Sequence, residues 1–262
     1  MRAEITETVA RKVLDTVDAG LVNGLGSPKP GSMCVEAAVC YALGLPHSDD
    51  PQCVSRALRT LKIRLNDSNW SGPKARANGL RRLALIQLGS AGALDDKEFV
   101  RRVAELAVRK SVPEALRAAA SVQKDAHHAS ALRDAADACE KEGTEEVARS
   151  ANAAANAAAR AAANAANAAN AAAYAAAYAA YAAYAANAAA YAADDAAYAA
   201  DDAAYAAAYA NAAYAANAAA YAADDAAYAR DKSLASFCEG VVQILIDMKV
   251  PGAQWLSLTE AT

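Results

Sequence analysis

Hydrophobic positions recur every three or four residues along most of this chain, which is the spacing of one face of an α-helix. Within residues 4–22 the apolar positions stand four residues apart: Ile5, Val9, Val13, Val17 and Leu21. No segment combines a sustained alternation of β-branched residues with a hairpin turn, the pattern that indicates paired strands. The pattern therefore predicts an all-α fold.

Turn-forming segments divide the first half of the chain into several helices. Residues 23–32 hold three glycines and two prolines and are predicted to form a loop, as are residues 44–51 and 66–73. Helices are expected between these loops, and a further helix is expected after a cap at Asp95 or Asp96. Pro113 suits the start of the helix beyond it, because a helix tolerates proline in its first turn.

Residues 144–230 have a different composition from the rest of the chain. Most positions from 151 to 229 are alanine, the best helix former, and no glycine or proline interrupts them. Polar and aromatic residues recur in this tract about every 3.5 residues, the period of a left-handed coiled arrangement. The segment 187–198 also returns unchanged at 217–228. We expect long alanine-rich helices, packed as hairpins or as a coiled-coil-like array.

These patterns predict three parts. Residues 1–143 form a helical N-terminal domain, residues 144–230 form the helical tract rich in Ala, Tyr, Asn and Asp, and residues 231–262 carry a C-terminal amphipathic helix. The last helix presents Leu234, Phe237 and Val241 on one face. We expect that face to dock on the N-terminal domain.

Composition narrows the choice of partners and compartment. The net charge is −4, whereas a domain that binds nucleic acid usually carries a basic patch, and Glu98 and Glu105 interleave with the one local group of arginines. No run reaches the roughly 20 strongly apolar residues of a membrane span. The five cysteines are irregularly spaced, and the first residues lack the apolar stretch of a signal peptide. We therefore expect a cytoplasmic protein that binds neither nucleic acid nor membrane.

Tyrosine points to a role in interaction. Eleven of the twelve tyrosines lie in the tract, and tyrosine is common at interfaces because its apolar ring carries a polar tip. The sequence thus predicts a non-enzymatic structural or interaction protein without a cofactor, which binds a protein partner or forms a homo-oligomer. The expected interaction residues are Tyr174, Tyr178, Tyr181, Tyr184, Tyr191, Tyr198, Tyr205, Tyr209, Tyr214, Tyr221 and Tyr228.

An alternative function rests on Cys34. It follows a glycine-containing loop at the expected start of a helix, where free backbone amides and the helix dipole lower the pKa of a thiol. The segment from Cys34 to Pro46 resembles the nucleophile helix of transglutaminase-type hydrolases, which implies a cysteine-dependent hydrolase or transferase with His47 as its nearby base. Those folds carry their other catalytic residues on strands, which this sequence lacks, so a buried structural cysteine is favoured.

Two weaker site hypotheses also arise. Asp194, Asp195, Asp201 and Asp202 resemble the aspartate-rich helices that hold magnesium in isoprenoid synthases, but Tyr198 stands where that motif ends in aspartate. We interpret these pairs as solubilising or register-setting residues and expect no metal. A third function class, a small-molecule binder, would use the loop 23–32 together with Trp70.

The segment MCVEAAVCYALGLPHSD, which spans residues 33–49, resembles a segment of bacterial proteins that have no assigned activity. Some chains with a similar alanine- and tyrosine-rich composition are described as immunity proteins, a resemblance of composition only. The resemblance implies a bacterial source and supplies no catalytic residues.

Overall fold

The computed structural model of the chain describes residues 5–164 and 223–260. These residues form nine α-helices, one π-helical turn and one 3₁₀ helix. The described residues contain no strand, only an isolated bridge between Gly26 and Met33. The predicted all-α fold class is confirmed for this part of the chain.

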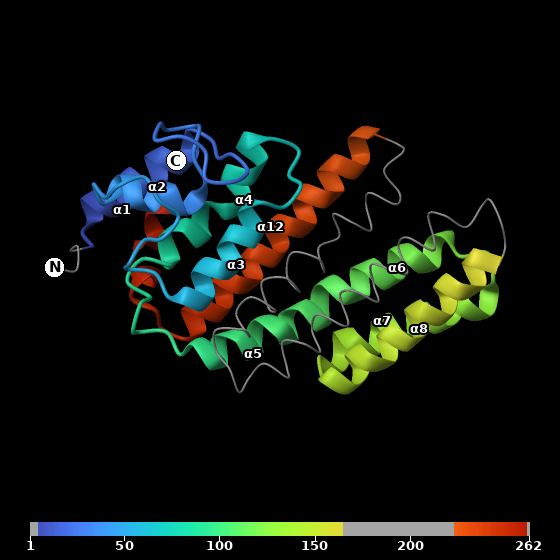
Figure 1. Cartoon of the computed structure of the whole chain (residues 1–262). Helices are drawn as coiled ribbons and strands as arrows, with labels where there is room; N and C mark the ends of the chain where they lie inside the picture. The colour runs from blue at the N-terminus through green and yellow to red at the C-terminus, as the bar shows by residue number, and fades with distance from the viewer. Residues whose placement is uncertain (1–4, 165–222, 261–262) are drawn as a thin grey trace.

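The N-terminal helices and the C-terminal segment make one packed body (Figure 1). Its helices are α1 (Glu7–Asp18), α2 (Val35–Ala42), α3 (Arg56–Asn66), α4 (Pro73–Ile86), α5 (Asp96–Leu106), α12 (Ala223–Asp247) and the 3₁₀ helix η3 (Pro251–Thr259). We call this body the head.

The first helix is shorter than the predicted range of residues 4–22. Thr6 caps α1, since its side-chain oxygen accepts a hydrogen bond from the Val9 amide at 3.4 Å. The helix ends at Asp18, and Gly20 follows with a φ of +118°, a backbone angle that favours glycine. At the centre of α1 the predicted apolar face is buried, since Val13 and Val17 have no exposed area.

Pro113 lies in the first turn of a helix, as the sequence predicted, but no loop precedes that helix. The chain stays helical from α5 through a π-helical turn, Ala107–Ser111, into α6 (Val112–Val122). Proline lacks an amide donor, and its ring collides with the carbonyl four residues earlier in a regular α-helix. The π-turn ends directly before α6 and has a hydrogen-bond pattern different from that of an α-helix. Such turns are a known way for a helix to accommodate a local distortion such as a proline.

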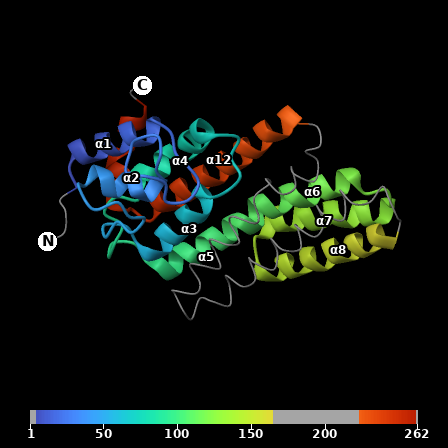
Figure 2. The same ribbon diagram turned by 45° about the horizontal axis from the view of Figure 1, so that its top comes forward.

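Three helices lie side by side next to the head: α6, α7 (Ala126–Glu142) and α8 (Glu145–Asn164), as both ribbon views show (Figures 1 and 2). Gly143 ends α7 in the left-handed region, with a φ of +65°. The helix α8 packs mainly on α7. Its buried face consists of Val147 and four alanines without exposed area: Ala148, Ala151, Ala155 and Ala158.

The polar stripe of α8 lies beside this contact face. Asn152 and Asn156 are half-buried, and the Asn156 amide donates a hydrogen bond of 2.9 Å to the Asn152 oxygen. Ala153 and Ala157 face outward. The contact with α7 is therefore made by bare alanine.

The C-terminal segment packs on the N-terminal helices. α12 lies mainly against α4 and also touches α5, while η3 contacts α4 and α1. Leu234, Phe237 and Val241 are buried in this contact. α12 begins at Ala223 and is continuous across residues 230 and 231, where the sequence suggested a boundary between two parts.

The group of arginines forms ion pairs on helix surfaces. Glu98 binds Arg101 at 2.8 Å and Arg102 at 2.7 Å. Glu105 binds Arg109 at 2.9 Å. The interleaved glutamates thus partner Arg101, Arg102 and Arg109 on the helix surface. Among the helices that the structure describes, none has the length and apolar character to cross a membrane.

The alanine contact gives a first prediction. Ala155→Leu adds volume to a packed face, so we expect the free energy of unfolding to fall by about 1–3 kcal/mol. The same change at exposed Ala153 should leave it within about 0.5 kcal/mol. Urea unfolding followed by circular dichroism measures both. Equal effects of the two substitutions would contradict the observed packing face.

Candidate functional site

The candidate site lies at the start of α2, where the loop 23–32 meets α2 and α3. Cys34 caps α2, and its sulfur accepts a hydrogen bond from the Ala37 amide at 3.4 Å. The side-chain oxygen of Asn66, at the end of α3, accepts a bond from the Val35 amide at 3.2 Å. Two amide donors of the first turn, which have no partner within a helix, are thereby bound.

A buried ion pair joins α2 to α3. Lys62 Nζ lies 3.2 Å from Glu36 Oε1, and both side chains are completely buried. The ammonium and the carboxylate are within ion-pair distance but are not aligned as a hydrogen bond. Glu36 Oε2 has no hydrogen-bond partner among the described residues. The pair is thus held by charge, with little hydrogen-bond support.

Burial dominates the titration of both partners. It raises the pKa of Glu36 and lowers the pKa of Lys62, because a charged group loses hydration inside the protein. The opposite charge of the partner acts against each shift. Removing one partner would leave the other charge buried alone, which costs far more than the pair itself.

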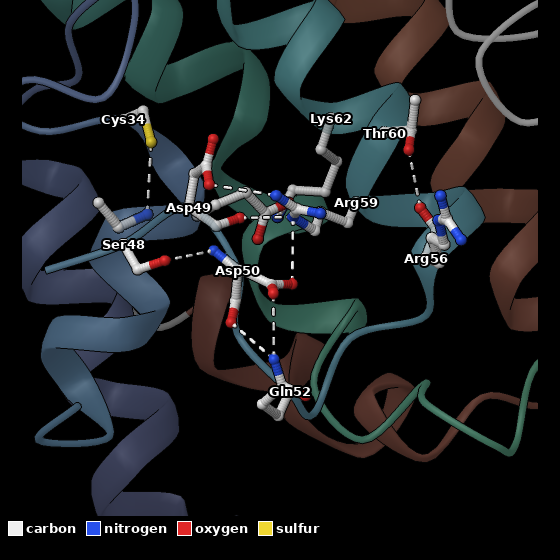
Figure 3. A network of polar contacts seen from close by, with 11 residues as sticks. Cys34, Ser48, Asp49, Asp50, Gln52, Arg56, Arg59, Thr60 and Lys62 are labelled. Atoms are coloured by element: carbon white, nitrogen blue, oxygen red, sulfur yellow. Dashed lines mark hydrogen bonds and ion pairs between the residues drawn. The ribbon is translucent and has the colours of Figure 1, made fainter. Parts of the chain in front are cut away.

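The loop after α2 is fixed by Arg59 of α3 (Figure 3). Arg59 Nε donates to the Asp49 carbonyl at 2.7 Å, and Nη2 binds Asp49 Oδ1 at 3.1 Å. Arg59 also lies 3.4 Å from the carboxylate of Asp50, which accepts a bond from Gln52 at 3.1 Å. These contacts hold the Asp49 carboxylate beside the start of α2.

The loop before α2 is fixed from α3 as well. Asp67 Oδ1 accepts bonds from the Gly24 amide at 2.8 Å and from the Asn66 amide group at 2.9 Å. The same Asn66 group also donates to the Val22 carbonyl at 2.9 Å. Asn66 and Asp67 therefore tie the loop 23–32 to both helices.

A small cavity of about 30 Å³ lies between these elements. Its lining comes from both loops and both helices: Gly24, Leu25, Cys34, Val35, Glu36, Asp49, Ile63, Asn66 and Asp67. Water needs roughly 10–15 Å³ of such space, so this cavity holds about two or three groups of that size.

Cys34 does line this cavity, but its thiol is not activated. Burial raises its pKa, and the hydrogen bond from the Ala37 amide only reduces that shift. The expectation of a lowered pKa was wrong, because the loss of hydration outweighs the helix amides. Burial also raises the pKa of the other cysteines, to about 12 for Cys40 and Cys238 and to about 11 for Cys139, and it raises the pKa of Cys53 as well.

His47 and Trp70 are engaged elsewhere. His47 Nε2 lies 3.2 Å from the Gly26 carbonyl, to which its N–H donates in the matching tautomer. The Trp70 indole is buried, donates to the Leu65 carbonyl at 2.9 Å, and packs so closely on Gly79 of α4 that a Cβ there would lie 2.2 Å from the ring. Neither residue lines the cavity described above.

The other predicted site residues belong to the tract. Asp194, Asp195, Asp201 and Asp202 lie outside the described residues, as do the predicted interaction tyrosines except Tyr228. Tyr228 lies on α12 and is 74% exposed. In the described ranges, 5–164 and 223–260, no three His, Cys, Asp or Glu side chains converge in a way that would hold a metal ion.

Sequence reasoning missed Glu36, Lys62, Asn66 and Asp67. A signal for the ion pair was present, because Lys62 stands four residues after Leu58 and three before Leu65, on the apolar face of α3. Glu36 is the one charged residue in α2. A charge on an apolar face predicts a buried partner of opposite sign. Comparison with family models, curated proteins and solved structures gave no match to the chain.

The ion pair gives a second prediction. Lys62→Met should lower the free energy of unfolding by about 3–5 kcal/mol, because it leaves the Glu36 carboxylate buried without a counter-charge. The double variant Glu36→Leu with Lys62→Met should recover most of this loss. Chemical unfolding measures both variants. A matched control is Arg11→Met in the exposed Glu7–Arg11 pair, which should cost less than about 1 kcal/mol. A double variant that is less stable than Lys62→Met would contradict this account.

The cysteine titration gives a third prediction. Alkylation of Cys34 by iodoacetamide at neutral pH should be slower than that of N-acetylcysteine amide, because a raised pKa leaves little thiolate. Peptide mass spectrometry measures the rate for each cysteine, with Cys34→Ser as the control that identifies the modified peptide. Labelling faster than the reference thiol would show an activated sulfur and revive the hydrolase or transferase hypothesis.

Proposed function

We propose that this chain is a non-enzymatic helical interaction protein that self-associates through an extended alanine face. The observation that carries the proposal is the contact of α8 with α7. There Ala148, Ala151, Ala155 and Ala158, spaced by three and four residues, are completely buried. This spacing defines a seam, which we call the α8 seam.

The sequence continues the α8 seam beyond the described helix. If the same alternation of four and three residues is carried on past Ala158, each position is alanine until Asn211 interrupts the series. These positions are 162, 165, 169, 172, 176, 179, 183, 186, 190, 193, 197, 200, 204 and 207. A helix with this heptad spacing presents one continuous face of alanine.

A second seam extends backward from α12. The buried positions Arg230, Leu234, Phe237 and Val241 have the same spacing of three and four residues. If this spacing is continued toward the N-terminus, each further position is alanine: 227, 223, 220, 216 and 213. We call this the α12 seam. The seams from both flanking helices thus run into the tract as alanine.

Tyrosines follow seam alanines in the sequence of both seams. Each of seven tyrosines follows a seam alanine in sequence: Tyr184, Tyr191, Tyr198, Tyr205, Tyr214, Tyr221 and Tyr228. In α12 the pattern has a visible form, since Ala227 is half-buried whereas the neighbouring Tyr228 is 74% exposed. Successive residues of a helix point about 100° apart, so this spacing keeps the tyrosine rings off the seam and leaves the seam as bare alanine, which suits a closely packed helix partner.

A second copy of the chain is the partner that this face fits best. A two-fold interface places the same face on both subunits, so an alanine seam meets an equally small seam and the helices approach closely. The alternative of a cysteine-dependent hydrolase or transferase has less support, because burial raises the pKa of Cys34 and its sulfur already accepts a hydrogen bond.

A register-matched pair of variants tests the proposal. Ala179→Glu with Ala193→Glu places charges on the α8 seam, whereas Ala185→Glu with Ala199→Glu adds the same charges at the same separation, at positions that lie off the seam. We expect an oligomer for the wild-type full chain, loss of that oligomer in the seam variant, and no change in the control variant, because burying an unpaired charge is costly. Size-exclusion chromatography with light scattering measures the mass of each protein in solution, over a range of concentrations.

Two results would contradict self-association. One is a wild-type chain that stays monomeric at every concentration. The other is an oligomer of unchanged mass in the seam variant, which would place the subunit contact elsewhere. Circular dichroism of the seam variant separates two cases. A loss of helix content indicates a seam that packs inside one chain, whereas unchanged helix content together with loss of the oligomer indicates a seam that packs between copies.

A further inference from the structure

We propose that the cavity at the start of α2 binds a primary ammonium group, either of a small alkylamine or of a lysine side chain. The inference concerns a different part of the molecule from the alanine seams and does not depend on them. It rests on the size of the cavity, on the groups that line it and on the open hydrogen-bonding capacity of Glu36.

The cavity leads from the surface to a polar floor. Leu25, which is 42% exposed, and Asp67 lie at its exposed side, whereas Cys34, Glu36 and Asn66 are buried. Gly24, Asp49 and Ile63 have intermediate exposure. A ligand that enters past Leu25 and Asp67 therefore reaches the buried carboxylate of Glu36 last.

The charge of the lining selects a cation. Three carboxylates line the cavity, those of Glu36, Asp49 and Asp67, and no lysine or arginine does. Lys62 and Arg59 pair with Glu36 and Asp49 from outside the lining. A carboxylate only accepts hydrogen bonds when ionised, so a ligand for this lining needs N–H or O–H donors.

Glu36 supplies the anchor. Its Oε1 lies near Lys62, but its completely buried Oε2 has no hydrogen-bond partner among the described residues. A buried carboxylate oxygen without a donor is costly, and a bound donor would remove that cost. An ammonium group offers three donors, enough for Glu36 and for a second acceptor in the lining.

Size separates an ammonium group from other cations. The cavity volume of about 30 Å³ accommodates a group as small as water, which suits –NH₃⁺ and is too small for a trimethylammonium group. A metal ion requires ligands that converge on one point, and the described acidic side chains do not converge in this way. The alkyl chain of the amine would leave along Leu25, as the stem of a lysine follows apolar surface.

The test uses n-butylammonium chloride and the full wild-type chain, with two-dimensional NMR of the backbone amides of Gly24, Val35 and Glu36. We expect saturable shifts of these amides. Soluble n-butanol serves as the uncharged control, and tetramethylammonium chloride controls for size and ionic strength. Neither control should produce the saturable shifts.

Variants test which carboxylates contact the bound ammonium group. Asp67→Asn keeps an oxygen to accept the Gly24 amide while removing the charge, and we expect it to weaken butylammonium binding about fivefold. Asp50→Asn removes a neighbouring carboxylate that does not line the cavity and should leave binding unchanged. The Glu36→Gln variant, provided that its spectrum stays that of the folded protein, should abolish the shifts.

A lysine peptide, acetyl-Gly-Lys-Gly-amide, distinguishes the two sources of the ammonium group. Tighter binding of the peptide than of butylammonium assigns the pocket to a polypeptide partner, and tighter binding of butylammonium assigns it to a free amine. Three results would overturn the proposal: no saturable shift with either amine, equal shifts with butanol or tetramethylammonium, or identical binding by wild type and Asp67→Asn.

Discussion

A buried alanine side chain removes little apolar surface from water, so a helix faced with alanine gains stability only where a neighbouring backbone comes close. The contact of α8 with α7 depends on this constraint, since four fully buried alanines form its centre. Glycine serves the same purpose in the head. A Cβ at Gly240 of α12 would lie 2.8 Å from the Leu106 side chain, and a Cβ at Gly79 would collide with Trp70. Small residues at contact faces thus allow the helices of both regions to pack closely.

The start of α2 obeys the opposite constraint, because charged and polar groups there are buried and must be satisfied. The Asn66 side chain is fully satisfied, because its oxygen accepts a hydrogen bond from the Val35 amide and its NH₂ group donates one to the Val22 carbonyl. Glu36 is not, since within the described part of the chain its one ion-pair partner is the Lys62 ammonium and its Oε2 has no hydrogen-bond donor. Natural cores keep few such groups, and those that persist are often tied to specificity or to function. The cavity beside Glu36 is therefore the part of the head whose polarity packing alone does not explain.

Local patterns in the sequence predicted the helices and their inward faces well. The apolar steps in α1 and α12 became buried faces, because periodicity records burial directly. Pro113 was placed correctly in the first turn of a helix, but no local signal showed that a π-helical turn rather than a loop joins that helix to α5. The pKa of Cys34 was predicted in the wrong direction for a similar reason: the helix amides are local, but the burial that outweighs them comes from distant residues. The partnership of Glu36 with Lys62 was visible as two misplaced charges, yet which charge meets which depends on how α2 crosses α3.

The two alanine seams also give meaning to the internal repeat. Segment 187–198 returns thirty residues later, which is four heptads plus two residues. The α8 seam ends at Ala207, where the next position in its series is Asn211, whereas the α12 seam begins at Ala213, again two residues later. The repeat therefore places each copy in the same relation to its own seam, and the offset falls between the copies. In one uninterrupted helix, two residues correspond to about 200° of rotation, so the second seam would face nearly opposite to the first. A single partner helix would then be unable to cover both seams, and the tract would need two separate contacts to bury its alanine.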